Sequence, residues 1–243
     1  MFGLIVSDPN HDAARREDLS TLLHSLDIPL SAFTEGPAPL FPADMSRAAF
    51  LRAASAALLQ PGQPLPLDAL LTHLSTPDPL PANVLRRYLF LRWSLMPYLR
   101  RRRKITELDG CILLGDDLLV VPVCPDDTVD VLLPPGLWTE LTGPLHEGRL
   151  RCMRGYNEMP VLARENALIP ISINGQSLTQ TTNDDADRLT LHWFQPHDSA
   201  ECTLADRTNY HVQCVGEQVD VHTNTDKAFH LIIHRDGREV LIR

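Results

Sequence analysis

Clustered carboxylates are the first residues in this sequence that could do chemistry, because paired acidic groups can donate and accept protons. Three groups stand out: Asp116–Asp117, Asp126–Asp127 and Asp184–Asp185–Asp187. The first pair sits inside "CILLGDDLLVVPV", between two apolar runs. Adjacent strand residues point to opposite sides, and aspartate readily caps turns. We therefore interpret Asp116–Asp117 as a turn between two strands and not as a catalytic pair.

The other two acidic groups lie in turn or linker contexts. The group at Asp184–Asp185–Asp187 begins like a calcium-binding loop, but it lacks the glycine and the distal glutamate that such a loop needs. We interpret both groups as solvated loop. The sequence also contains no G-x-S-x-G nucleophile elbow and no glycine-rich phosphate loop.

Histidines are the second candidates for chemistry. His222, His230 and His234 lie on neighbouring predicted strands, and His230 and His234 share a face by the period of two. Three imidazoles could bind zinc. Histidines scattered on a solvated sheet face are the alternative, and we favour that interpretation. His192 and His197 do not form a more convincing metal-binding pattern. We thus expect no catalytic residue, no cofactor and no metal ion.

Composition bounds the class of protein. A chain of 243 residues with 44% hydrophobic residues can bury a core in one to three domains. Its net charge of −9 argues against nucleic acid as a partner, because phosphate binding needs a basic field. The basic run Arg100–Lys104 ends a predicted helix, where it complements the helix dipole.

Cysteines and hydropathy indicate the compartment. The five cysteines form no C-x-x-C pair and no zinc spacing, which is typical of buried free thiols in a reducing compartment. The N-terminus has no signal-peptide pattern, and no apolar run reaches about 18 residues, so we expect no membrane span. We therefore expect a cytoplasmic protein.

The chain changes character near Ile105. The first third is helix-rich and broken by prolines, and its strongest helix, Ala82–Lys104, contains Pro97, which should kink it. After Ile105 the sequence consists of short apolar or alternating runs separated by turn residues, a pattern typical of antiparallel β-sandwiches. A polar linker at Asn174–Asp187 divides these runs. The predicted strands include residues 118–123, 129–134, 150–153, 160–164, 167–172, 189–194, 200–205, 210–215, 218–223, 229–235 and 239–243.

These elements predict a mainly β, α+β protein of three parts. Residues 1–105 form an N-terminal α/β region that ends in a long helix. Residues 106–173 form a proximal β-sandwich, and residues 174–243 form a distal one.

Four segments carry a resemblance to a known family. In order they are "LFLRWSLMPYLR", "LLGDDLLVVPV", "VDVLLPPGLWTELTGPLHEG" and "MPVLARENALIPI". Together they resemble the C-terminal part of glycoside hydrolase family 31, the α-glucosidase and α-xylosidase family, over Leu85–Ile173. The resemblance implies that residues 1–105 are the end of a (β/α)₈ barrel with its closing helix. It also implies that Trp138 packs internally, whereas Trp193 could either be buried or stack on a sugar.

The family's catalytic machinery has no counterpart in the sequence. The resemblance implies a retaining mechanism, which needs two carboxylates about 5–5.5 Å apart. A complete barrel takes about 250 residues, and about 105 precede the first sandwich strand. Upstream only Ser7, Asp8 and Gly36 match, and Thr34 or Glu35 replaces a substrate-contacting histidine. The resemblance therefore predicts a degenerate or truncated relative without the nucleophile and acid/base aspartates, inactive by itself.

Three functions remain in competition. The first is a non-catalytic relative with a structural or assembly role. The second is the C-terminal subunit of a split retaining α-glycosidase, and the third is a carbohydrate-binding β-sandwich module. An incomplete barrel surface would need another chain or a second copy to cover it, and exposed apolar surface there would favour the split enzyme.

Overall fold

The computed structural model describes residues 91–92, 94–100, 105–108, 111–121, 129–141, 143–152, 160–172, 189–215, 218–236 and 238–242. The expected barrel remnant before residue 91 and the linker at Asn174–Asp187 lie outside these residues. Within them, residues 91–92 and 94–99 are helical and thirteen strands follow, so the prediction of a mainly β protein is confirmed. No helix of the described part is long and apolar enough to cross a membrane.

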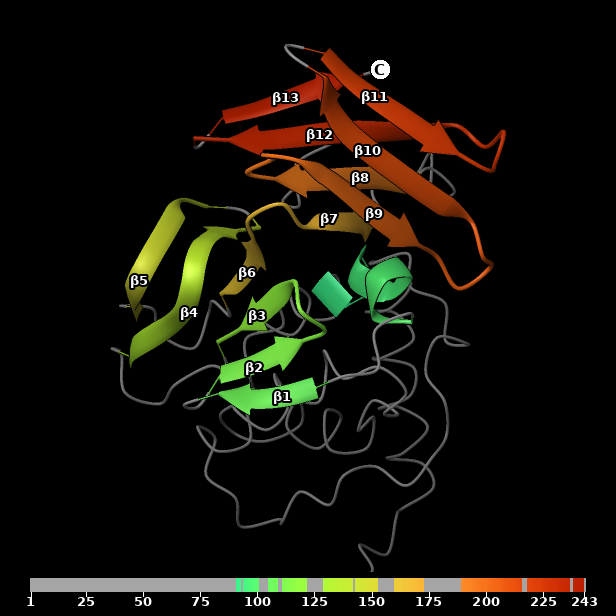
Figure 1. Ribbon diagram of the computed structural model, residues 1–243. Helices are drawn as coiled ribbons and strands as arrows, with labels where there is room; N and C mark the ends of the chain where they lie inside the picture. Colours follow the sequence, from blue (N-terminus) through green and yellow to red (C-terminus); the bar gives the residue numbers. More distant parts are fainter. Residues whose placement is uncertain are drawn as a thin grey trace, which may run out of the picture.

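Six antiparallel strands form the first sheet, which we call the proximal sheet (Figure 1). In spatial order they are β1 (Ile105–Leu108), β2 (Cys111–Leu114), β3 (Leu118–Val120), β6 (Val161–Arg164), β4 (Val129–Glu140) and β5 (Leu145–Cys152). The hydrophobic core of this region is one cluster of buried residues: Cys111, Leu119, Val121, Val131, Leu133, Trp138 and Leu162. Strands β1–β6 therefore form one antiparallel sheet with one buried core, and the proximal β-sandwich expected at 106–173 stays a prediction.

Strand β4 runs further than the sequence indicated. It was predicted to stop at residue 134, yet it continues through Pro134, Pro135 and Gly136 to Glu140. Proline lacks the N–H that a sheet ladder needs, so it is tolerated where the ladder is interrupted. Such an interruption is present, because the register with β5 shifts between Leu132 and Leu137, and Gly136 has a φ of 114°. The bulge turns the strand and lets its second half pair with both β5 and β6.

The C-terminal strands form two facing sheets. A four-stranded sheet has the order β13 (Arg238–Ile242), β12 (Phe229–Arg235), β8 (Leu189–Phe194) and β7 (Leu168–Ile171). A three-stranded sheet has the order β11 (Gln218–Thr223), β10 (Asn209–Val215) and β9 (Ser199–Thr203), and lies in front of it in Figure 1. Both sheets contribute to one core: Leu168, Leu191, Trp193, Cys202, Tyr210, Val212, Leu231 and Ile233.

One strand pair departs from the expected antiparallel sandwich. Strands β8 and β12 are parallel, with Leu189 opposite Phe229 and Phe194 opposite His234. Parallel neighbours need a long crossover connection. Here β9, β10 and β11 of the facing sheet supply it, so the chain re-enters beside β8 in the same direction.

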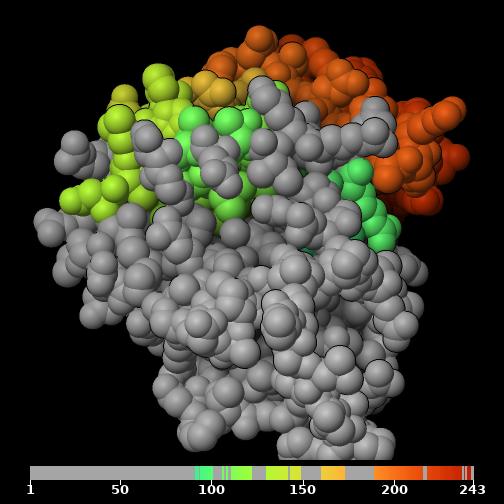
Figure 2. Space-filling model, turned by 90° about the horizontal axis from the view of Figure 1, so that it is seen from below, coloured from blue at the N-terminus to red at the C-terminus, as the bar shows by residue number. Residues whose placement is uncertain are grey.

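Strand β7 links the two regions. It follows β6 after a turn at Glu165–Asn166, and it pairs with β8, with Leu168 opposite Trp193. The backbone N–H of Asn166 donates to the Phe194 carbonyl at 2.6 Å. In Figure 2 the gold atoms of this part of the chain lie between the yellow-green and the orange regions. The pairing thus crosses residue 173, where a domain boundary was predicted.

Candidate functional site

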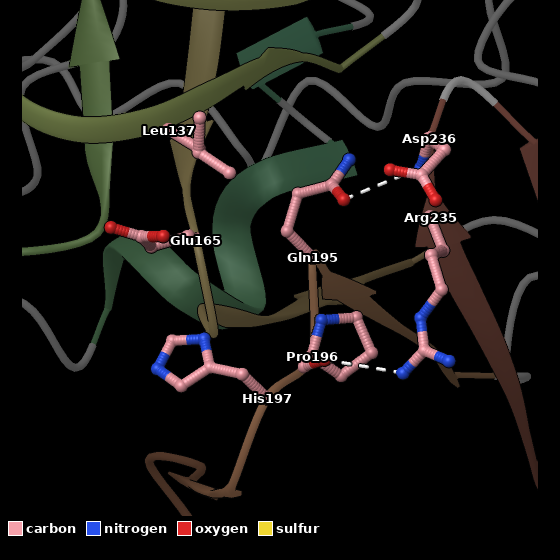
Figure 3. A pocket seen from close by; sticks show the side chains of 7 residues that line it. All are labelled: Leu137, Glu165, Gln195, Pro196, His197, Arg235 and Asp236. Atoms are coloured by element: carbon pink, nitrogen blue, oxygen red, sulfur yellow. Dashed lines mark hydrogen bonds between the residues drawn. The ribbon is translucent and has the colours of Figure 1, made fainter.

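A shallow, open pocket of about 440 Å³ lies where the proximal sheet meets the four-stranded sheet (Figure 3). Four chain segments meet there: strand β4, the turn after β6, the segment after β8, and the end of β12 with the turn that follows it. The lining residues are Leu137, Glu165, Gln195, Pro196, His197, Arg235 and Asp236.

Left-handed backbone conformations shape the rim. Asn166, Gln195 and Asp236 have φ values of 61°, 43° and 51°. Asparagine and aspartate tolerate this region, as their place in tight turns requires. Glutamine is less suited to it, so the surrounding contacts must hold the backbone of Gln195 in place.

Gln195 forms hydrogen bonds to residues on two sides of the pocket. The residue is 8% exposed, and its Nε2 donates to Thr139 Oγ1 of β4 at 3.4 Å. Its Oε1 accepts from the backbone N–H of Asp236 at 3.3 Å, and its own N–H donates to the His234 carbonyl at 2.8 Å. One buried amide therefore connects the proximal sheet to the β12–β13 turn.

The pocket chemistry is polar and of mixed charge. The carboxylates of Glu165 and Asp236 lie on opposite sides of Gln195 in Figure 3, and Arg235 Nη2 donates to the Pro196 carbonyl at 3.2 Å. His197 is exposed. These groups can bind hydroxyls or other small polar groups. None of the seven lining residues is a tryptophan, tyrosine or phenylalanine on which a sugar ring could stack.

The pair Asp116–Asp117 forms a turn, as predicted. Residues 115–117 connect β2 to β3, and Gly115 has a φ of 65°. The hydroxyl of Tyr98 lies 2.8 Å from the Leu114 carbonyl oxygen and 3.2 Å from Asp117 Oδ2. The Asp117 carbonyl accepts from Arg164 N–H at 2.8 Å. Asp117 thus joins the helix, the turn and β6.

Several candidates fall outside the described residues. They are Asp126–Asp127, Asp184–Asp185–Asp187 and the upstream positions Ser7, Asp8, Thr34, Glu35 and Gly36. Their interpretation stays a prediction. In the described part no group of three or more His, Cys, Asp or Glu side chains is arranged to hold a metal ion.

The interpretation of the histidines as a scatter on a solvated face is wrong for His234. His234 is 6% exposed on β12, whereas His222 is exposed on β11 of the facing sheet. His230 shares the face of His234, as the period of two predicted, and its buried Nδ1 has no hydrogen-bond partner among the described residues. The three rings therefore do not converge.

His234 instead pairs with His192 of β8. Nδ1 of His192 lies 2.8 Å from Nε2 of His234, and His234 stacks on Phe194 with centroids 4.2 Å apart. Burial, and next the nearby His234, lower the pKa of His192 to about 3, and burial lowers the pKa of His234 to about 4. Both rings are neutral at pH 7, so one donates and the other accepts. Their separation of 42 residues hid this pair from sequence reasoning.

Both tryptophans considered for sugar stacking are fully buried. Trp138 is 0% exposed and its Nε1 donates to the Pro134 carbonyl at 2.9 Å, which confirms its expected burial. Trp193 is also 0% exposed, and its Nε1 donates to Asn166 Oδ1 at 3.2 Å. Neither indole can present a face to a sugar.

A buried acid–imidazole pair was not anticipated. Glu140 at the end of β4 is 5% exposed, and its Oε1 lies 2.8 Å from Nε2 of His146 on β5. Gly143 fits the turn between them, because a Cβ there would lie 2.9 Å from Glu140 Oε2. The spacing E-x₅-H across a glycine turn is the signal that sequence reasoning could have used.

Two of the cysteines are buried thiols, as expected. Cys111 and Cys202 are buried and are not in a disulfide in the described part of the chain, and Cys214, also outside any disulfide there, is half-buried. Cys124 lies outside the described residues, and Cys152 lies on β5.

Comparisons with known proteins agree with this architecture. Residues 88–169 match the profile of the Glycosyl hydrolase family 31 C-terminal domain. The cycloalternan-forming enzyme from Listeria monocytogenes superposes with a TM-score of 0.61 at 21% identity over 83% of this chain and 23% of that one. The GH31 dextranase of Flavobacterium johnsoniae gives 0.54 and 17% over 77% of this chain and 30% of that one. A comparison with curated proteins found no match.

At these identities the structural likeness shows the fold. The glucosidase II alpha subunit gives a TM-score of 0.54 at 13% identity, and this chain covers 27% of it. The chain thus spans less than a third of the length of each of these three enzymes. Together with the matched profile, they confirm the resemblance to the C-terminal part of the family.

Proposed function

We propose that this carbohydrate-related protein, whose residues 88–169 match the profile of the Glycosyl hydrolase family 31 C-terminal domain, is non-catalytic alone and has a structural or assembly role. The role rests on what the family-like segments do here. Tyr98 of the helix hydrogen-bonds to the turn at Leu114–Asp117, and Trp138 of β4 is fully buried. These segments hold the fold together.

The carboxylates of the described part also support this proposal. Asp117 accepts a hydrogen bond from Tyr98, and Glu140 is buried against His146. Glu165 and Asp236 line the pocket from different turns and lie on opposite sides of Gln195 (Figure 3). A retaining glycosidase needs two carboxylates facing one another across a sugar about 5–5.5 Å apart. Asp117 and Glu140 are thus engaged in contacts within the fold, which supports a structural role for them.

The proposal includes a partner. Another chain or a second copy of this one would cover the barrel surface of the N-terminal region. The proposed location is the cytoplasm, and carbohydrate is the proposed ligand. Size-exclusion chromatography with light scattering, with and without the products of neighbouring genes, tests for it.

Hydrolysis of aryl α-glucosides and α-xylosides tests the catalytic part. We expect no turnover by the purified chain. Turnover that is lost in Glu165→Gln or Asp236→Asn would place an active site in the pocket and end the proposal.

A second candidate is the C-terminal subunit of a split α-glycosidase. The observation that favours it is the likeness in fold to parts of two enzymes, with TM-scores of 0.61 for the cycloalternan-forming enzyme and 0.54 for the dextranase. Activity that needs both this chain and a second polypeptide would select this candidate.

A carbohydrate-binding module is the third candidate, and the open pocket with its polar lining favours it. Its affinity would come from hydrogen bonds, because Trp138 and Trp193 are buried. Titration with glucose and isomaltose, compared between the parent chain and His197→Ala, tests it.

A further inference from the structure

The outer face of the three-stranded sheet carries a polar row that none of the functions above uses. Tyr210 and Val212 of β10 point into the sandwich core, so His211 between them points outward. Across the strands, His211 is directly opposite His222 of β11 on one side and Glu201 of β9 on the other. Two imidazoles and one carboxylate, both types of metal ligand, therefore stand side by side on the outer face of this sheet.

The two imidazoles are close enough to share an ion. Their ring centroids are 6.4 Å apart and their planes differ by 28°. Directly opposed residues in an antiparallel pair have Cβ atoms about 4.5–5.5 Å apart. Two nitrogen ligands that each lie about 2.0–2.1 Å from one zinc ion are about 3.4 Å from each other, so chelation requires the two rings to rotate toward a shared ion.

Both rings are accessible for binding. His222 is exposed and His211 is half-buried. No hydrogen bond in the described part of the chain involves either ring, in contrast to His192 and His146. Glu201 is held by Asn209 Nδ2 at 2.9 Å.

We propose that His211 and His222 chelate a divalent transition-metal ion such as Zn²⁺ or Cu²⁺ on this face. Imidazole is a preferred ligand of both ions. Two protein ligands leave the other positions to water, which makes this an exchangeable surface site and agrees with the lack of a three-residue group among the described residues. The carboxylates of Glu201 and Asp220, on the same face, add favourable charge.

A bound ion would fasten the edge of the sandwich. Strand β11 is the outermost strand of its sheet and is paired only with β10 in the described structure. An ion held by His211 and His222 adds a second connection across this pair. Ligands that bind only the folded state raise its stability.

Calorimetric titration of the full chain with ZnCl₂ tests the proposal, together with the variants His211→Asn and His222→Asn. His197→Asn is the matched control, because His197 is another exposed histidine of the described part. We expect one zinc ion per chain, and at least about 10-fold weaker binding in either single variant but not in the control. Equal affinity in all four proteins, or no binding to the parent chain, would overturn the proposal.

Cu²⁺ electron paramagnetic resonance identifies the ligands independently. We expect nitrogen splitting from two imidazoles in the parent chain and in His197→Asn, and its loss in either variant. Matching far-UV circular dichroism of the metal-free proteins excludes unfolding as the cause. A two-nitrogen signal that survives both substitutions would assign the copper to other residues and reject the site.

Discussion

His192 Nδ1 lies 2.8 Å from His234 Nε2, and this bond connects two parallel strands on the face of the four-stranded sheet that points away from the sandwich core. The two rings are 5% and 6% exposed, and His234 lies flat on Phe194 with 8° between the planes. Burial keeps both imidazoles neutral, because the charged form would lose its hydration. Protonation of either ring therefore destabilises the folded state.

Stability should consequently fall in mild acid. The pKa values of His192 and His234 are lowered from 6.5 to about 3 and about 4, so the unfolded chain binds protons at a higher pH than the folded one. The stability that the two neutral histidines contribute is fully present above pH 6.5. It is lost as the pH falls toward their lowered pKa values of about 4 and about 3. Between about pH 7.5 and 5, each histidine should cost about 2 kcal/mol. Urea unfolding at both pH values measures the loss.

The variant His234→Gln isolates this effect, because its amide can still hydrogen-bond to His192. The loss of stability between the two pH values should be about half that of the parent chain. His197→Gln, with an exposed side chain, should leave it unchanged. An equal loss in His234→Gln and in the parent chain would contradict the assignment.

Removal of the Tyr98 hydroxyl tests the joint between the helix and the β2–β3 turn. Tyr98→Phe leaves the buried Leu114 carbonyl without this partner, so we expect a loss of about 1–2 kcal/mol of unfolding free energy. Glu147→Gln, at an exposed residue of β5, should change stability by less than about 0.5 kcal/mol. Chemical denaturation measures the free energy of unfolding of both variants. An unchanged value for Tyr98→Phe would show that the hydrogen bond of Tyr98 to the β2–β3 turn does not stabilise the fold.

Two substitutions of Gln195 distinguish the cost of its strained backbone from the loss of its side-chain hydrogen bonds. Both Gln195→Ala and Gln195→Gly remove the amide that bridges Thr139 and Asp236, so both should be less stable than the parent chain. Only alanine retains the cost of a φ of 43°. Thermal unfolding should therefore rank glycine above alanine by about 1 kcal/mol. The reverse order would mean that the conformation is not strained.

Trp193 is predicted to be purely a core residue. Trp193→Ala removes a fully buried indole from the core of the two facing sheets and should cost about 3–5 kcal/mol. Trp193→Phe retains most of the volume but loses the bond to Asn166, and should cost less. Unfolding curves give both values. Wild-type stability of Trp193→Ala would refute its burial.

Local patterns in the sequence predicted the strands well. The alternation in "NYHVQCV" gives β10 its buried Tyr210 and Val212, and the aspartates after Gly115 form the expected turn. Such patterns depend on neighbours in the chain, which the sequence shows directly. They also placed His230 and His234 on one face.

Pairings between distant segments could not be predicted in this way. A period of two does not tell which strand lies beside β8 or in which direction, so the parallel β12 and the His192–His234 bond were missed. Strand β4 crosses two prolines because a bulge at Gly136 interrupts the ladder, which a proline rule alone excludes. The pocket was missed because its residues come from four separate segments, a strand and three turn regions, none of which carries a distinctive motif.

The decisive measurement is the release of 4-nitrophenol from the α-glucoside and the α-xyloside by the purified chain. We expect no release above the protein-free rate, for the parent chain and for Glu165→Gln and Asp236→Asn alike. Turnover by the purified parent chain would overturn the non-catalytic proposal, and its loss in either variant would locate the active site in the pocket.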